Sequence, residues 1–123
     1  MEPAFRTIRV ELPHLGLLHI EGPDAATFLQ SQLTSDVLAL IAVNEAQWTG
    51  YCNPKGRLYF TGWLAKTAAH RPAFALMIDR SMTQAMLKRL RMFVLRSKLS
   101  VDDLSHGLTL HGSLSFEGAD ESE

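Results

Sequence analysis

The chain is poor in the features that would assign it to a functional class at once. Its 123 residues include one cysteine, Cys52, so an internal disulfide is excluded and a reducing compartment is expected. Twelve basic and 13 acidic residues give a net charge of −1, which offers no basic footprint for a nucleic acid or an anionic membrane. No apolar run approaches the roughly 20 residues that a bilayer-spanning helix needs. The first ten residues have no hydrophobic signal region, so we expect a cytoplasmic protein without a membrane or direct nucleic-acid partner.

The chain also lacks the residue patterns of common catalytic and metal sites. Neither a catalytic triad nor a phosphate-binding glycine loop is evident in the sequence. The five histidines show no paired spacing such as His-x-x-x-His, so no metal site is expected. Cys52 precedes Lys55, a cation that can lower a thiol pKa, but a buried small hydrophobe is the favoured interpretation. The basic run from Lys88 to Arg96 is broken by apolar residues, which is typical of a solvated helix face.

The remaining pattern predicts one domain of mixed α and β structure. An apolar fraction of 46% and a charged fraction of 20% suit a globular protein of this length. We predict the order β-β-α-β-β-β-α-β-β, an α+β fold with a mostly antiparallel sheet and two amphipathic helices on one sheet face. The single domain is expected over 1–115, followed by a disordered acidic tail over 116–123. The strands are predicted at 5–10, 15–20, 46–52, 58–65, 73–78, 98–101 and 108–114.

Two amphipathic helices are predicted from polar caps followed by apolar residues at helical spacing. Asp24 is the expected N-cap of the first, and Asp79 or Ser81 that of the second. Asp36 is expected to cap a short helical turn that follows the first helix. The apolar stripes comprise Phe28, Leu29 and Leu33 in the first helix and Met82, Ala85, Met86, Leu90 and Phe93 in the second. We therefore expect Phe28 and Phe93 to be deeply buried.

A β-hairpin is predicted around the sequence Asn53-Pro54-Lys55-Gly56. Proline presets φ and glycine supplies a positive φ, so this tetrapeptide is typical of a tight turn between two strands. Trp48 and Trp63 flank the turn on opposite strands. Their rings could stack on a planar ligand, although packing in the core is the favoured interpretation.

Two polar groups are the candidate binding residues. The first group surrounds the end of the first helix and comprises Gln30, Gln32, Thr34, Ser35 and Asp36. These side chains could bind the polar edge of a heterocycle, although capping is the commoner role of such residues. The second lies in the hairpin turn, where Asn53, Lys55 and Arg57 could hold a carboxylate or phosphate. Surface cations on an ordinary turn are the commoner interpretation here too.

Two segments together carry a family resemblance. The sequence I-E-G-P-D-A-A-T-F-L-Q-S-Q-L-T-S-D-V starts at Ile20, and Y-C-N-P-K-G-R-L starts at Tyr51. They resemble the N-terminal part of the YgfZ family, which is related to the folate-binding aminomethyltransferase, or T-protein, of the glycine cleavage system. The resemblance extends from about Leu15 to Gly112 and includes F-A-L-M-I-D and V-L-R-S-K-L.

The resemblance implies a fold, a cofactor and a role. The implied cofactor is tetrahydrofolate, and the implied role is support of iron–sulfur cluster assembly or repair, with iron–sulfur proteins as partners and an effect on tRNA modification. Lys55 and Arg57 would meet the glutamate-tail carboxylate of the folate. The full set of folate-binding positions that it implies is Gln32, Thr34, Asp36, Asn53, Lys55 and Arg57.

Two departures from the family pattern limit these expectations. Aminomethyltransferases carry an acidic pair shortly after the hairpin turn, whereas this chain has Arg57-Leu58-Tyr59-Phe60. No catalytic residue is therefore assigned, and aminomethyl transfer is not expected. The YgfZ hallmark K-G-C-Y-x-G-Q-E is also absent, and Cys52 does not take its cysteine's role. A fragment or shortened relative is expected; a non-enzymatic protein-interaction domain is the alternative, and a small aminomethyltransferase the weaker one.

Overall fold

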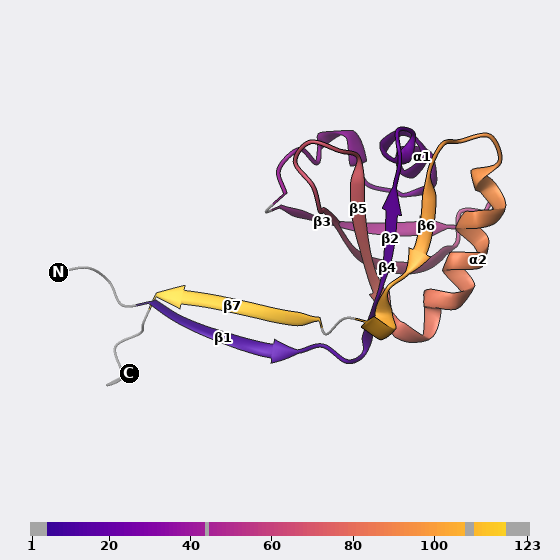
Figure 1. Ribbon diagram of the computed structural model, residues 1–123. Coiled ribbons are helices and arrows are strands. Elements are labelled where there is room, and N and C mark those ends of the chain that lie inside the picture. Colours follow the sequence, from indigo (N-terminus) through magenta and orange to yellow (C-terminus); the bar gives the residue numbers. More distant parts are fainter. Residues whose placement is uncertain (1–4, 44, 108–109, 118–123) are drawn as a thin grey trace.

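A computed structural model describes residues 5–43, 45–107 and 110–117 of the chain (Figure 1). The predicted order of strands and helices is confirmed. The strands are β1 (Phe5–Glu11), β2 (Leu15–Glu21), β3 (Ala46–Cys52), β4 (Leu58–Lys66), β5 (Ala73–Asp79), β6 (Ser100–Asp103) and β7 (His111–Glu117). The helices are α1 (Ala25–Gln32) and α2 (Thr83–Val94), and the 3-10 turns are η1 (Val37–Ala39), η2 (Arg80–Met82) and η3 (Ser105–Gly107).

The body of the protein is a five-stranded antiparallel sheet covered by both helices. The strand order is β3-β4-β5-β2-β6. Alternate strand residues, such as Leu18 and Ile20 of β2, enter one core cluster with Phe28 of α1 and Leu90 of α2. The α+β prediction is therefore confirmed. Each fully buried leucine or isoleucine contributes on the order of 1.5–3 kcal/mol through removal of apolar surface from water.

Both edges of this sheet are partly covered. At the β6 edge, Arg91 donates from Nε and Nη2 to the carbonyl oxygen of Val101, at 2.9 and 2.6 Å. At the β3 edge, Leu33 forms a bridge with Tyr51, and the Thr34 amide donates to the carbonyl oxygen of Gly50 at 2.9 Å. Since unpaired strand edges invite pairing with other chains, these contacts protect part of each edge.

Strands β1 and β7 form a separate antiparallel ribbon, which the sequence did not separate from the main sheet. Figure 1 shows this ribbon extending away from the body. Strand β7 continues to Glu117, so the expected boundary between domain and tail at 115/116 is two residues too early. Residues 118–123, the rest of the expected tail, lie outside the described residues.

Local contacts correct several expectations about the helices. Asp24 precedes α1 but does not cap it through its side chain; its carboxylate accepts from the amide of Lys98 at 2.8 Å. Asp79 caps the short turn η2 rather than α2, which follows Met82 and has no side-chain cap. Hydrogen bonds from the Ser81 hydroxyl and amide lower the pKa of the Asp79 carboxyl. Phe28 is buried, but Phe93 is 44% exposed, so its predicted burial is wrong. Leu87, absent from the predicted stripe, lies in the core instead.

Candidate functional site

The hairpin turn is organised by one side chain. The Asn53 carboxamide oxygen accepts from the amides of Lys55 and Arg57, at 3.0 and 2.9 Å. The Asn53 amide also donates to the Arg57 carbonyl at 2.8 Å, and Gly56 adopts φ +80°. Asn53 is therefore committed to the turn through this oxygen, whereas the side chains of Lys55 and Arg57 project into solvent.

The polar residues after α1 mostly hold the chain together. The Thr34 hydroxyl accepts from the Gly50 amide at 3.0 Å, and the Ser35 hydroxyl contacts the side chains of Gln47 and Thr49 at 2.7 Å each. Gln30 supplies the cap expected of Asp36, because its side-chain oxygen accepts from the Leu38 amide in η1 at 3.0 Å.

Gln32 and Asp36 differ in their surroundings. Gln32 ends α1 and is half-buried. The side chain of Asp36 is exposed and makes no capping bond, while its main-chain carbonyl accepts from Gln47 Nε2 at 3.0 Å. Asp36 is thus the charged side chain that this group of candidates presents to solvent.

The fold brings the two candidate segments to the same strand. The bridge between Leu33 and Tyr51 places the segment after α1 against β3, two residues before Asn53. Thr34 thus lies beside β3, and Asn53 directly follows the end of the same strand, although the two candidates are distant in sequence. Thr34 and Asn53 use these hydrogen bonds to hold the main chain, so Lys55 and Arg57 are the side chains left to meet an anionic ligand.

Trp48 and Trp63 do not lie in the core, so the favoured interpretation of these two side chains is wrong. They are 55% and 44% exposed, and their register places them directly opposite one another. Because Phe60 and Leu64 of β4 face the core, alternation puts Trp63 on the outer sheet face, away from the helices. The next residues across that face in register are Met77 of β5 and Leu17 of β2. An apolar row therefore crosses the outer face, and sequence alternation alone could not reveal which face the helices leave uncovered.

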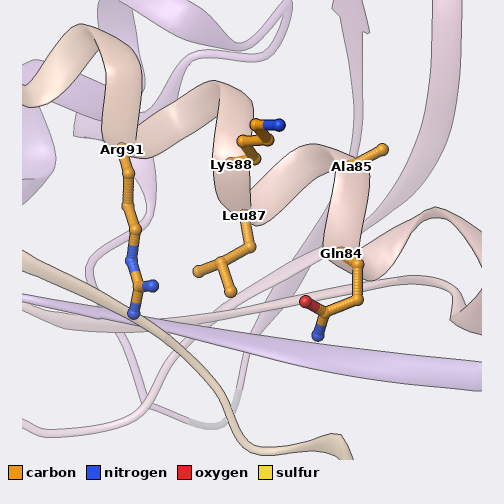
Figure 2. A pocket seen from close by; sticks show the side chains of 5 residues that line it. All are labelled: Gln84, Ala85, Leu87, Lys88 and Arg91. Atoms are coloured by element: carbon orange, nitrogen blue, oxygen red, sulfur yellow. The ribbon is translucent and has the colours of Figure 1, made fainter.

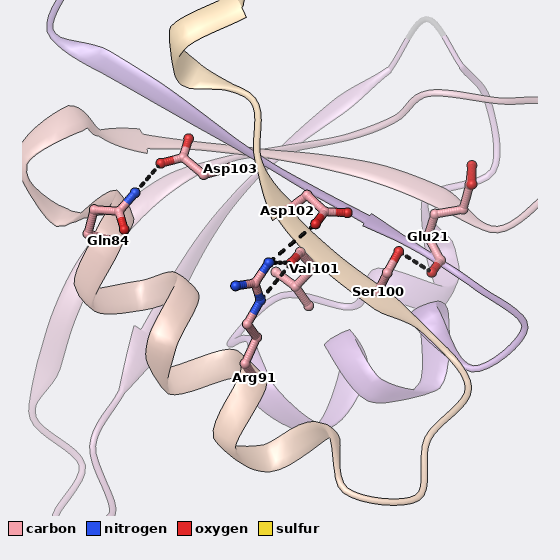
Figure 3. A network of polar contacts seen from close by, with 7 residues as sticks. All are labelled: Glu21, Gln84, Arg91, Ser100, Val101, Asp102 and Asp103. Atoms are coloured by element: carbon pink, nitrogen blue, oxygen red, sulfur yellow. Dashed lines mark hydrogen bonds and ion pairs between the residues drawn. The ribbon is translucent and has the colours of Figure 1, made fainter.

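A hollow separate from the hairpin lies on α2 (Figure 2). It has a volume of about 440 Å³ and is lined by Gln84, Ala85, Leu87, Lys88 and Arg91. Figure 3 shows that Gln84 and Arg91 extend from α2 to β6. Gln84 donates to Asp103 at 2.6 Å, and Arg91 contacts Asp102 at 3.2 Å in addition to the Val101 carbonyl.

The charge of Asp103 is set by these contacts. Burial opposes ionisation of its carboxyl, but hydrogen bonds from Ser105 and Gln84 outweigh burial and lower the pKa. The polar groups on this side of α2 thus fasten the helix to the sheet edge. We interpret the hollow as a consequence of that fastening rather than as a ligand site.

In the part of the chain that the structure describes, no group of three or more histidine, cysteine or acidic side chains is arranged to hold a metal ion. None of the helices found in the same residues is long and apolar enough to span a membrane. Cys52 is half-buried at the end of β3.

Comparison with known proteins places these features in a family. No family model matches the chain. A "tRNA-modifying protein YgfZ" of Vibrio vulnificus is 32% identical over 92 residues, covering 74% of this chain and 27% of that protein. An "iron-sulfur cluster assembly factor IBA57 homolog, mitochondrial" of Aspergillus oryzae is 30% identical over 107 residues, covering 78% of this chain and 24% of that protein. The chain therefore spans about a quarter of the length of these relatives.

A solved structure supports the fold independently. The glycine cleavage system aminomethyltransferase T from Bartonella henselae superposes with a TM-score of 0.69 at 22% identity, covering 80% of this chain and 27% of that one. At this identity the likeness shows the fold alone. Together with the sequence relatives it confirms the resemblance drawn from the residues: over about three quarters of its length, this chain is a YgfZ-like domain.

Proposed function

We propose that this domain contributes one wall of a tetrahydrofolate site and supports iron–sulfur cluster assembly or repair, and thereby tRNA modification, in the cytoplasm. The role rests on the relatives, whose names specify tRNA modification and iron–sulfur cluster assembly. The relatives named for cluster assembly are mitochondrial; the cytoplasmic location rests on the sequence expectation. Iron–sulfur proteins are the partners that this role requires.

The observation that carries the folate proposal is the arrangement of the β3–β4 hairpin. One of its ends presents two exposed indole rings, Trp48 and Trp63, and its turn presents the cations Lys55 and Arg57. Trp48 and Asn53, the first residue of the turn, are five positions apart along the chain, or roughly 17 Å at the usual rise per residue of a strand. A folate is likewise elongated, with a planar bicyclic ring at one end and carboxylates at the other.

The residues present fit such a ligand at each end. Indole faces stack on planar heterocycles, and a guanidinium forms a fork that matches a carboxylate. Of the six positions implied by the family resemblance, Lys55 and Arg57 carry the contact to the glutamate tail. Asp36 and Gln32 are proposed to contact the ligand from the segment beside β3, while Thr34 and Asn53 hold the main chain in place.

Binding is expected to be weak, because a ligand on an open sheet face keeps much of its surface in water. When bound, tetrahydrofolate supplies one-carbon carrier chemistry; this chain supplies binding and orientation. No acid or base for aminomethyl transfer is assigned among its residues.

Tryptophan fluorescence tests the proposal, since Trp48 and Trp63 are the two tryptophans of the chain. Tetrahydrofolate should quench their emission saturably, beyond the inner-filter loss measured with free N-acetyltryptophanamide. Arg57→Ala should weaken the saturable quenching, whereas Arg96→Ala, an exposed cation on another segment, should leave it unchanged. Quenching that matches the free indole, or that is equal in the two variants, would reject the site.

A non-enzymatic interaction domain is the second candidate. The specific observation that favours it is the number of large apolar side chains on the surface, among them Leu38 at 56% and Ile41 at 73% exposed, besides the tryptophans. Exposed apolar patches commonly mark protein contacts. Absence of folate binding together with intact folding would favour this role.

A further inference from the structure

An irregularity in the β3–β4 ladder changes the direction of one tyrosine. Tyr51 pairs with Phe60, but the next residue, Cys52, pairs with Leu58, which leaves Tyr59 as a bulge. The Tyr51 ring stacks with both neighbours, its centroid lying 6.1 Å from that of Tyr59 and 5.7 Å from that of Phe60. A bulge re-aims the extra side chain, so Tyr59 joins Phe60 on the side of α2 instead of alternating to the outer face.

Arg89 of α2 lies against these tyrosines. Its Nε donates to the Tyr51 hydroxyl at 3.1 Å, and its guanidinium carbon lies 4.6 Å from the centre of the Tyr59 ring. The hydrogen bond to Tyr51 raises the pKa of Arg89, so the group stays charged. Among the residues whose side chains the structure describes, no carboxylate forms an ion pair with Arg89. A guanidinium has five N–H donors, and Nε accounts for one.

A small hollow opens beside Arg89. Its volume is about 80 Å³, and it is lined by Tyr59, Phe60, Met82, Ala85, Met86 and Arg89. Sites for small organic ligands usually enclose roughly 300–1,000 Å³, so this hollow suits a single side chain rather than a whole cofactor. Tyr59 is 45% exposed at its rim, and the exposed ring of Phe93 lies one helical turn beyond Arg89. Tyrosine, phenylalanine, methionine and arginine are the residues enriched at the centres of protein interfaces.

We propose that this hollow is a docking site for a protein segment that inserts one apolar side chain and places a neighbouring carboxylate on Arg89. The volume limits the insert to one side chain, and the apolar lining selects an aliphatic or methionine group. The guanidinium, oriented by Tyr51 and Tyr59, selects a carboxylate because the fork of donors matches two carboxylate oxygens. This hollow lies between β4 and α2, whereas the proposed folate site lies on the outer face of the sheet and at the hairpin turn. The inference therefore does not depend on folate binding.

The test is selection of phage-displayed random dodecapeptides on the intact chain. Selected peptides should share an apolar residue beside Asp or Glu, and synthetic copies should shift the Arg89 Nε–H signal in NMR spectra. Arg89→Gln should weaken the synthetic peptides about tenfold or more, in line with loss of a charge-assisted bond. The matched neutralisation Lys88→Gln, on the next residue of the same helix, should not.

A second variant controls for any structural change that loss of the Arg89–Tyr51 hydrogen bond causes in Arg89→Gln. Ala85→Gln enlarges an exposed residue at the rim and keeps Arg89, so it should block the peptides while thermal unfolding stays unchanged. Selected peptides without an acidic residue, equal binding by Ala85→Gln, or failure to enrich any sequence would overturn the proposal. A concentration-dependent dimer that Arg89→Gln dissociates would overturn it too, and would assign the surface to a second copy of the chain.

Discussion

Trp48 and Trp63 lie directly opposite one another across the β3–β4 ladder, with ring centroids 5.0 Å apart and planes inclined by 70°. This edge-to-face pair is partly exposed on the sheet face that the helices leave open. Edge-to-face pairs stabilise by about 0.5–1.5 kcal/mol beyond area burial, so the two rings hold one another in place. The hairpin therefore presents an ordered aromatic surface rather than two mobile side chains.

The two phenylalanines of the helices should differ sharply in their contribution to stability. Phe28→Ala should lower the free energy of unfolding by about 3–5 kcal/mol, because it empties a buried position in the core. Phe93→Ala should cost less than about 1 kcal/mol, because Phe93 is partly exposed and lies outside the core cluster. Urea denaturation of both variants measures the difference. Similar losses would show that Phe93 is buried in solution.

The error over Phe93 has a geometric cause. Met82, Met86, Leu90 and Phe93 recur at helical spacing, so periodicity alone puts them on one stripe. The core cluster takes Met86, Leu87 and Leu90, however, and α2 ends at Val94. A repeat in the sequence does not show where the sheet beneath a helix stops.

Arg91 should stabilise the sheet edge. Arg91→Gln removes the two hydrogen bonds to the Val101 carbonyl and should lower the free energy of unfolding by about 1 kcal/mol, since the site is partly exposed. Lys88→Gln is the matched control and should change stability by less than about 0.5 kcal/mol. Chemical denaturation compares the two. Equal stability of both variants would show that the edge contact contributes nothing measurable.

Stability should fall in acid partly through Asp103. Its pKa is lower in the folded chain than the roughly 3.9 of an unfolded aspartate, so its contribution is present above that value and is lost as pH falls through the folded pKa. Asp103→Asn should therefore be less stable than wild type at pH 7 and show a shallower loss below about pH 4. Urea unfolding across this range is the measurement. An unchanged acid slope in the variant would contradict the assignment.

Contacts between distant residues explain what the sequence did not predict in the rest of the fold. Asp24 has the type and position of an N-cap, yet its carboxylate meets the amide of Lys98, 74 residues away in the chain. The hairpin, by contrast, follows from local chemistry: Asn53 and Gly56 build the predicted turn. The bulge at Tyr59 left no local signal, so the contact with Arg89 was not anticipated.

The chain should not transfer an aminomethyl group to tetrahydrofolate. The stretch Arg57-Leu58-Tyr59-Phe60 after the turn contains no carboxylate to position the folate amine or stabilise a developing ammonium. The measurement is methylene-tetrahydrofolate formation from an aminomethyl donor, against a protein-free control. Turnover well above the control would show that the acid lies elsewhere, and Asp36 and Asp79 would be the first candidates to substitute.

The most direct test of the folate site is a two-dimensional NMR titration of the ¹⁵N-labelled chain with tetrahydrofolate. Both indole N–H signals, from Trp48 and Trp63, should shift together with amides of the turn at 53–57. Arg57→Ala should lose roughly 1.5–3 kcal/mol of binding free energy, the range for a hydrogen bond to a charged group. No shifts at millimolar ligand, or shifts that leave both the indoles and the turn unchanged, would contradict the folate site.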